Sequence, residues 1–202
     1  MCGAVDEDLS ESSNVNLEAL FEKYRERLTR MVRLRMDQRL QGRIDPSDVI
    51  QEAGLEAARR MESYLRERPM TFFLWLRWLV SEQLIMQSRR HLGAEKRDAR
   101  REISIDHQGY GAMSSQLLAA HIMGSITGPS TAAIRAERRI RVQQALEVLD
   151  PMDREIIALR SFEQLTRAET ATVLGIEESA AGKRYLRALK RLKSAVGDER
   201  SG

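Results

Sequence analysis

Apolar residues recur at the spacing of an α-helix through most of the chain, and no stretch shows the two-residue alternation of a half-buried strand. The first such segment begins at Asn16 and reaches about Arg39, with Gly42 ending the helix. Its expected core positions are Leu17, Leu20, Phe21, Tyr24, Leu28, Met31 and Val32. The pattern therefore predicts an all-α fold whose helices pack on one another.

Two Asp-Pro pairs open further helices, at Asp45-Pro46 and Asp150-Pro151. Aspartate is a good N-cap and proline suits the first helical position. In the first of these helices, Gly54 costs up to about 1 kcal/mol relative to alanine. Its predicted core positions are Val49, Ala53, Ala57 and Met61. Polar residues lie on or beside the opposite face, at Asp48, Gln51, Glu52 and Glu56. The second helix is expected to reach Arg160.

A third helix follows a loop at residues 66–70, since Pro69 disfavours helix in the residue before it. Thr71 is the expected cap. The first half of this helix is almost wholly apolar, which predicts burial. The expected core positions are Phe72, Trp75, Leu76 and Leu79. Arg77 and Trp78 fall off this stripe, so the core is not expected to need them.

The stretch 160–196 predicts two helices joined at Gly175. Thr166 and Glu169 have the spacing of a capping box, so the first helix starts there. In the second, from Glu178 to Ala195, one face is apolar and carries Tyr185, Leu186, Leu189 and Leu192. The other face is basic and carries Lys183, Arg184, Arg187, Lys190 and Arg191. Such a helix-turn-helix lays its second helix in the DNA major groove.

The alternative for this basic face is a solvated surface on an ordinary bundle helix. Such faces usually interleave acids with bases, whereas residues 183–193 hold six basic side chains and no acid. Residues 89–101 are also strongly basic. Local basic patches, rather than the overall charge of +3, are the mark of a polyanionic partner.

Composition divides the chain of 202 residues into parts. Residues 1–15 form an acidic tail that we expect to be disordered. Residues 103–129 are rich in Gly and Ser and lack Lys, Arg and Glu, which predicts a flexible linker with one helical turn near 116–123. The remaining parts, 16–102 and 130–197, are predicted to be two small helical domains. The first helix of the second domain is expected to pack through Ile134, Ile140, Ala145 and Leu146.

Other classes of protein find little support. Cys2 is the only cysteine and the three histidines lack ligand spacing, so no disulfide framework, metal site or other cofactor is expected. No carboxylate cluster or activated nucleophile suggests an enzyme. No apolar run reaches the roughly 18 residues that a membrane span needs, and no signal peptide is present, so a cytoplasmic protein is expected.

The order of these motifs resembles a bacterial RNA polymerase sigma factor of the extracytoplasmic-function (ECF) subgroup of the sigma-70 family. The resemblance covers residues 17–196. It is carried by DPSDVIQEAGLEAARR, RRHLGAEKRDARRE, ALEVLDPMDREIIALRSF and RALKRLK. It implies a region 2-like domain over 16–102 and a region 4-like domain over 130–197. It also implies a non-enzymatic protein that binds core polymerase and directs transcription initiation at particular promoters.

The resemblance assigns roles to residues at matching positions. Docking on a coiled coil of the largest polymerase subunit falls to Asp48, Gln51, Glu52 and Leu55. Recognition and melting of the minus-10 element, as duplex and single strand, fall to Arg66, Arg68, Arg77, Trp78, Gln83, Arg89, Arg90, Lys96 and Arg97. Contacts with the minus-35 element fall to Arg167, Ser179, Lys183, Arg184, Arg187, Lys190 and Arg191. An anti-sigma factor is a further candidate partner.

Some residues depart from the family pattern. Glu177 stands where members often have Ser or Thr, and small residues occupy Ala180, Ala181 and Gly182. Upstream recognition is therefore expected to rest more on phosphate contacts and close backbone approach than on base edges.

Two other functions remain open. A free-standing helix-turn-helix regulator explains residues 160–196, but gives the polar face at 48–56 and the basic segment at 89–101 no role. An enzyme acting on nucleic acid would need a catalytic cluster that the sequence does not show.

Overall fold

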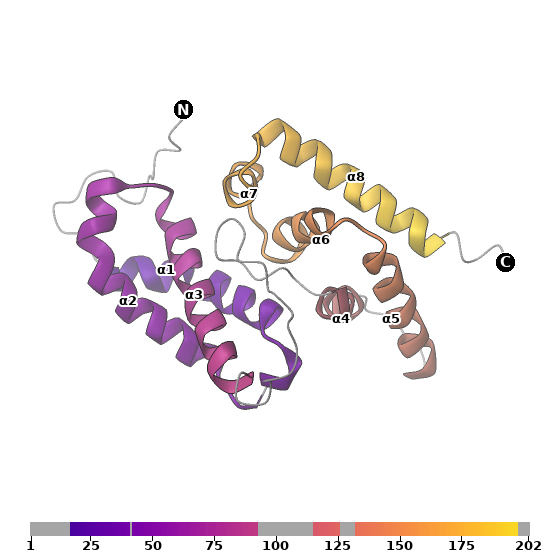
Figure 1. The fold of residues 1–202 in the computed structure, drawn as a ribbon, viewed down its shortest axis with the longest axis horizontal. Helices are drawn as coiled ribbons and strands as arrows, with labels where there is room; N and C mark the ends of the chain where they lie inside the picture. Colours follow the sequence, from indigo (N-terminus) through magenta and orange to yellow (C-terminus); the bar gives the residue numbers. More distant parts are fainter. Residues whose placement is uncertain (1–16, 41, 93–114, 126–131, 198–202) are drawn as a thin grey trace. The chain divides into compact units, whose positions relative to one another are not determined.

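The computed structural model describes residues 17–40, 42–92, 115–125 and 132–197. The chain forms two compact units, residues 1–111 and 112–202. All regular elements among the described residues are helical (Figure 1), which confirms the predicted all-α fold. None of the described helices is both long and apolar enough to cross a bilayer. The predicted tail, most of the linker and Lys96 and Arg97 lie outside the described residues.

The first unit is built from three long helices, α1 (Leu17–Arg35), α2 (Pro46–Glu67) and α3 (Phe72–Leu92), with a short 3-10 turn, η2 (Gln38–Leu40), after α1. Each long helix packs against the other two. Helix α1 ends earlier than predicted, and the chain then turns through Gly42, whose φ of 86° suits glycine. Asp45 caps α2 as predicted, because its Oδ1 accepts from the Ser47 N–H at 2.8 Å.

The core of the first unit follows the predicted stripes. Buried positions include Phe21, Tyr24, Leu28, Met31 and Val32 on α1, Val49, Ala53 and Ala57 on α2, and Phe72, Trp75, Leu76 and Leu79 on α3. Gly54 has a packing role that the sequence did not reveal. A Cβ at this position would lie 3.2 Å from Cζ of Phe21, so the missing side chain lets the α1 ring sit against the α2 backbone.

The connection between α2 and α3 is tied to the core by Tyr64. Its ring stacks on Trp75 with centroids 4.4 Å apart, and its hydroxyl donates to the Met70 carbonyl at 2.9 Å. Helix α2 extends through the first two residues of the predicted loop to Glu67, and Arg68 then lies in the left-handed region at φ 38°. The predicted cap at Thr71 is wrong, since its buried Oγ1 has no hydrogen-bond partner and only its backbone carbonyl accepts from Trp75.

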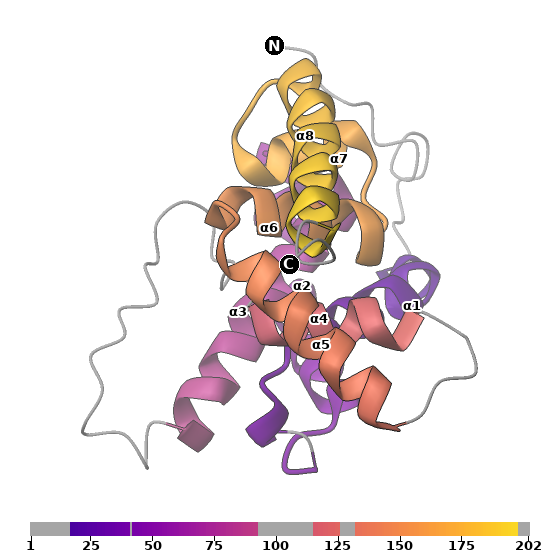
Figure 2. The same ribbon diagram turned by 90° about the vertical axis from the view of Figure 1, so that its right-hand side faces the viewer.

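The second unit holds α4 (Ser115–Ser125), α5 (Ala132–Glu147), α6 (Pro151–Ile157), a π-helical turn η3 (Ala158–Phe162), α7 (Arg167–Leu174) and α8 (Glu178–Gly197). Figures 1 and 2 show α8 lying along α6 and beside α7. The helical turn predicted within the linker is an 11-residue helix that packs on α5. The predicted domain bounds themselves stay predictions.

Helix α5 buries a different face from the one predicted. Ala145 and Leu146 are buried as expected, but Ile134 and Ile140 are exposed at 42% and 57%. Helix α5 packs on α4 and α8, and its buried positions start at Val142 and continue past its end to Leu149. The second Asp-Pro pair behaves as predicted, because Asp150 Oδ1 accepts from the Met152 N–H at 2.8 Å.

Both tryptophans of the chain belong to the first unit, so tryptophan fluorescence reports its unfolding alone. Leu28 is 1% exposed. We predict that Leu28→Ala lowers the free energy of unfolding of this unit by about 2–5 kcal/mol, measured by urea titration. Leu55→Ala, at a position 57% exposed, is the control and should change it by no more than about 0.5 kcal/mol. Equal losses for the two variants would contradict the assigned core.

Candidate functional site

The turn between α7 and α8 is built by local interactions that the sequence predicted. Thr166 Oγ1 accepts from the Glu169 N–H at 3.1 Å, and Glu169 Oε2 accepts from the Thr166 N–H at 2.7 Å. This reciprocal capping box starts α7. Gly175 ends it at φ 64°, a left-handed conformation that suits glycine. The two helices therefore form the predicted helix-turn-helix.

Helix α8 packs through small residues. Ala181 and Ala188 are 2% and 0% exposed, which lets the α8 backbone approach α6 and α7 closely. Tyr185 reaches η3, where its hydroxyl lies 3.0 Å from Ser161 Oγ. The predicted apolar face is wrong at Leu186, which is 66% exposed. The buried stripe is rotated about the helix axis toward the alanines, whose short side chains give a weaker hydrophobic signal than leucine.

On the side that this rotation turns toward α6, two of the predicted DNA contacts pair with acids. Arg184 Nε lies 2.7 Å from Asp153 Oδ1, and Arg191 Nη1 lies 2.6 Å from Asp153 Oδ2. Arg184 Nη2 also meets Asp150 Oδ1 at 2.7 Å. Asp153 is 1% exposed. A buried carboxylate is tolerated when it is paired, so this Asp153 cluster (Asp153, Arg184 and Arg191) joins α8 to α6.

The remaining predicted minus-35 contacts lie in solvent. Ser179, Lys183, Arg187 and Lys190 are all exposed. Arg167 at the start of α7 is also exposed, and its Nε pairs with Glu178 Oε1 at 3.4 Å. The structure thus separates the predicted set into an outward group on α8, one arginine on α7 and two arginines engaged by acids of α6 and its cap.

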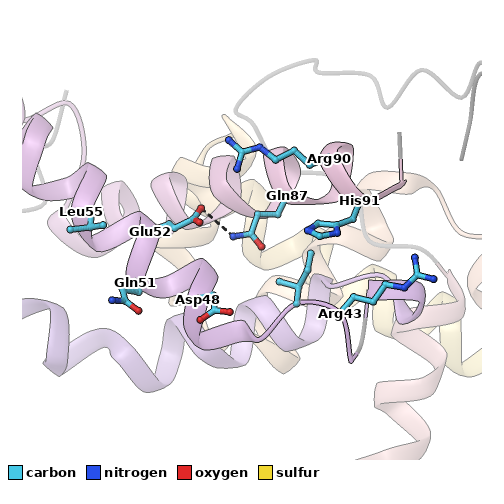
Figure 3. Close-up of a pocket in the computed structure, with 9 residues that line it drawn as sticks. Arg43, Asp48, Gln51, Glu52, Leu55, Gln87, Arg90 and His91 are labelled. Atoms are coloured by element: carbon cyan, nitrogen blue, oxygen red, sulfur yellow. Dashed lines mark hydrogen bonds between the residues drawn. The ribbon is translucent and has the colours of Figure 1, made fainter. Parts of the chain in front are cut away.

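A pocket of about 440 Å³ lies between α2 and the end of α3 in the first unit (Figure 3). The four predicted polymerase-docking residues all line it from α2: Asp48, Gln51, Glu52 and Leu55. Gln87 on α3 donates to Glu52 Oε2 at 3.1 Å and holds that carboxylate at the pocket wall. The sequence analysis missed four lining residues that lie far from α2 along the chain or beside its start, namely Arg43, Ile44, Gln87 and His91.

Arg60 links the polar side of α2 next to this pocket to α3. It donates to Glu56 Oε1 at 2.5 Å and to Glu82 Oε2 of α3 at 3.2 Å. The hydrogen bond from Arg60 lowers the pKa of the partly exposed Glu56 carboxyl. Glu56 therefore stays charged at neutral pH and keeps Arg60 in place. The guanidinium also lies over the Trp78 ring, 5.4 Å from its centroid.

The predicted minus-10 residues do not share one surface. Arg66, Arg68, Arg89 and Arg90 are exposed and Trp78 is partly exposed. Arg77 and Gln83 are buried at 0% and 9%, so the expectation that the core does not need them is wrong. Arg77 falls off the predicted stripe, but α3 is covered on all sides in its first half, where residues 72–77 are all buried.

A comparison with protein-family models finds a match within the second unit. Residues 139–192 match the family model described as sigma-70, region 4. These residues include most of α5 and all of α6 and α7, and they reach into α8. They match a sigma-70 region 4 domain, and over this segment the resemblance to the sigma-70 family is confirmed. A search of curated proteins finds no match.

Two solved structures are similar over most of the chain. One is the structure of CnrH in complex with the cytosolic domain of CnrY, with 20% identity, a TM-score of 0.48, and coverage of 90% of this chain and 88% of that one. The other is the sigma factor RpoE in complex with the anti-sigma factor NepR from Bartonella quintana, with 16% identity, a TM-score of 0.47, and coverage of 89% and 98%.

The Asp153 cluster makes a specific prediction about stability. Asp153→Asn should lower the free energy of unfolding of the second unit by about 3–5 kcal/mol, because two arginines lose the buried charge that they face. Arg191 is 59% exposed on its side chain, so Arg191→Ala should cost only about 0–1 kcal/mol. Circular dichroism in urea measures both, in the transition that tryptophan fluorescence does not follow. Lys190→Ala is the matched control, and an Asp153→Asn protein as stable as that control would contradict this role.

Proposed function

We propose that the protein is a sigma factor of the ECF subgroup, which binds core RNA polymerase in the cytoplasm and directs initiation at particular promoters. The observation that carries this proposal is the coincidence of a sigma-70 region 4 match with a helix-turn-helix whose outward face is basic. In this proposal α8 contacts the minus-35 element, while the first unit binds polymerase and opens the minus-10 element.

The pocket in the first unit supports the polymerase-binding part of the proposal. Residues assigned to docking by the resemblance are spread over two turns of α2, yet they line one concavity with Gln87 and Arg90 of α3. Leu55 is exposed there at 57% beside two carboxylates. An exposed leucine with charged neighbours suits a protein interface, where an apolar centre is buried inside a polar rim.

The exposed arginines beside the core aromatics support the melting part. Arg66 and Arg68 lie at the end of α2, where Tyr64 anchors the connection to α3. Opening a duplex needs cations that hold the freed strand and surfaces on which bases stack. Phe72 and Trp75 are committed to the core at 0% and 5% exposure. Trp78, which is partly exposed, is the better stacking surface in this unit.

Run-off transcription tests the proposal directly. Purified core polymerase is incubated with the full chain and a library of genomic fragments, and the transcripts are sequenced. Transcripts with shared upstream and downstream elements, seen only when the protein is added, are the expected result. Strong footprints on duplex DNA without polymerase, together with no effect on transcription, would favour a free-standing regulator instead.

Docking depends on the α2 side of the pocket, so we predict that Asp48→Arg with Gln51→Ala abolishes binding to core polymerase. Loss of a buried interfacial charge costs about 2–5 kcal/mol. Asp48 and Gln51 are exposed, so circular dichroism should show an intact fold. Glu62→Arg, at an exposed position nearer the other end of α2, is the control. Retention of wild-type affinity in a pull-down by the double variant would refute the docking site.

Melting should depend on Arg66 and Trp78. We predict that Arg66→Ala with Trp78→Ala leaves polymerase binding unchanged and slows open-complex formation roughly fivefold or more, since a base stacked on an aromatic ring gains about 1–3 kcal/mol. Permanganate reactivity of unpaired thymines measures the rate. Glu67→Ala, at a neighbouring exposed position, is the control. A pre-melted template should restore the double variant, and failure on that template as well would show that this segment is not the melting device.

A further inference from the structure

Leu186 lies in solvent at 66% exposure, in the middle of a helix that packs through Ala181 and Ala188. Burial of a leucine side chain is worth about 1.5–3 kcal/mol, so exposing it forgoes that stabilisation. The packing of α8 explains the direction of the side chain. Ala181 and Ala188 occupy the buried side, and at 100° per residue both lie about 140–160° around the axis from Leu186.

Cations surround this leucine. At the same helical spacing Ser179, Lys183 and Lys190 lie within about 60° of Leu186, and all three are exposed. Arg184 and Arg191 lie on the far side, paired with Asp153. The outward face of α8 therefore carries an apolar group between two ammonium groups, and the Ser179 hydroxyl lies two turns toward the N-terminus. We call Ser179, Lys183, Leu186 and Lys190 the reading face.

We propose that Leu186 contacts the C5-methyl group of a thymine in the upstream promoter element and selects for that base. The inference rests on the proposed function of α8 as the helix that enters the major groove. The reading face requires a partner that is polyanionic overall and apolar at one spot. In the major groove the thymine methyl is such a spot, and phosphates flank it on both strands.

The position of Leu186 along α8 fits this contact. It is the ninth residue of the helix, about 12 Å along the axis from Glu178, a length close to the width of the major groove. The lysines one turn on either side can then reach phosphates. A protein partner would be expected to offer acids to these lysines, but it would not distinguish thymine from uracil. Replacing thymine by uracil therefore distinguishes DNA from a protein as the partner of Leu186.

The test starts from promoters selected with core polymerase and the full chain from a library randomised over the upstream element. The wild-type protein should enrich thymine at one position or more, and Leu186→Ala should lose that preference at one of them. Replacing this thymine by deoxyuridine removes only the methyl group. Initiation by the wild-type protein should then fall about fourfold, the value of one buried methyl group, whereas Leu186→Ala should be indifferent to the replacement.

Two control variants isolate the effect. Val148→Ala, at a position 77% exposed in the same unit but outside α8, should select the same promoters as wild type and lose the same fourfold with deoxyuridine. Lys190→Ala should weaken all sequences alike and lower the salt slope by about one unit, as expected for a phosphate contact. Leu186 is exposed, so the variant should fold as wild type does.

Three results would overturn the inference alone, provided that the wild-type protein selects promoters. They are identical base profiles for wild type and Leu186→Ala, no deoxyuridine effect at any thymine, and an equal effect on both proteins. A fourth such result is weaker binding of core polymerase by Leu186→Ala, because it would show that Leu186 contacts a protein and not DNA. If no promoter is selected at all, the proposed function itself fails.

Discussion

The charge of Asp153 constrains the second unit more than any single apolar contact does. The carboxylate is 1% exposed, and a charge so deeply buried is stable only with cations at hydrogen-bonding distance. Arg184 and Arg191 of α8 supply them. Two ion pairs two turns apart on one helix fix its rotation about its axis. That rotation decides which side chains face outward, so a buried acid on α6 determines the surface that α8 offers to a partner.

In the first unit, the packing of side chains rather than a buried charge decides which side of a helix faces outward. Phe21 packs where Gly54 has no side chain, and Tyr64 stacks on Trp75. These contacts commit one side of α2 to α1 and α3 and leave the side with Asp48 and Leu55 facing the pocket. In both units the candidate functional surface is the side of a helix that does not pack on the core. The surface is therefore sensitive to core substitutions that touch no partner.

Local signals in the sequence predicted local structure well. The caps at Asp45, Asp150 and Thr166 depend on residues within three positions of each other, and all three form as expected. The four docking residues could be grouped in advance because they share one helix. The rotation of α8 could not, since its sequence offers two adjacent stripes and the leucines outweigh the alanines in hydrophobicity. Only the acid on α6, far away along the chain, decides between them.

The charges beside the reading face limit how α8 can recognise a base. Arg167 lies against Gly182, with its Cδ at van der Waals distance, 3.4 Å, from the place that a Cβ there would occupy. Arg167 then reaches Glu178 at 3.4 Å, which lowers the negative charge near the end of α8 that enters the groove. With Arg184 and Arg191 engaged by Asp153, the α8 cations directed outward are chiefly lysines, and lysine binds phosphate as a point charge rather than guanine through a fixed fork. Apart from Arg187, which is exposed, an apolar contact is the way left for such a face to distinguish one base from another.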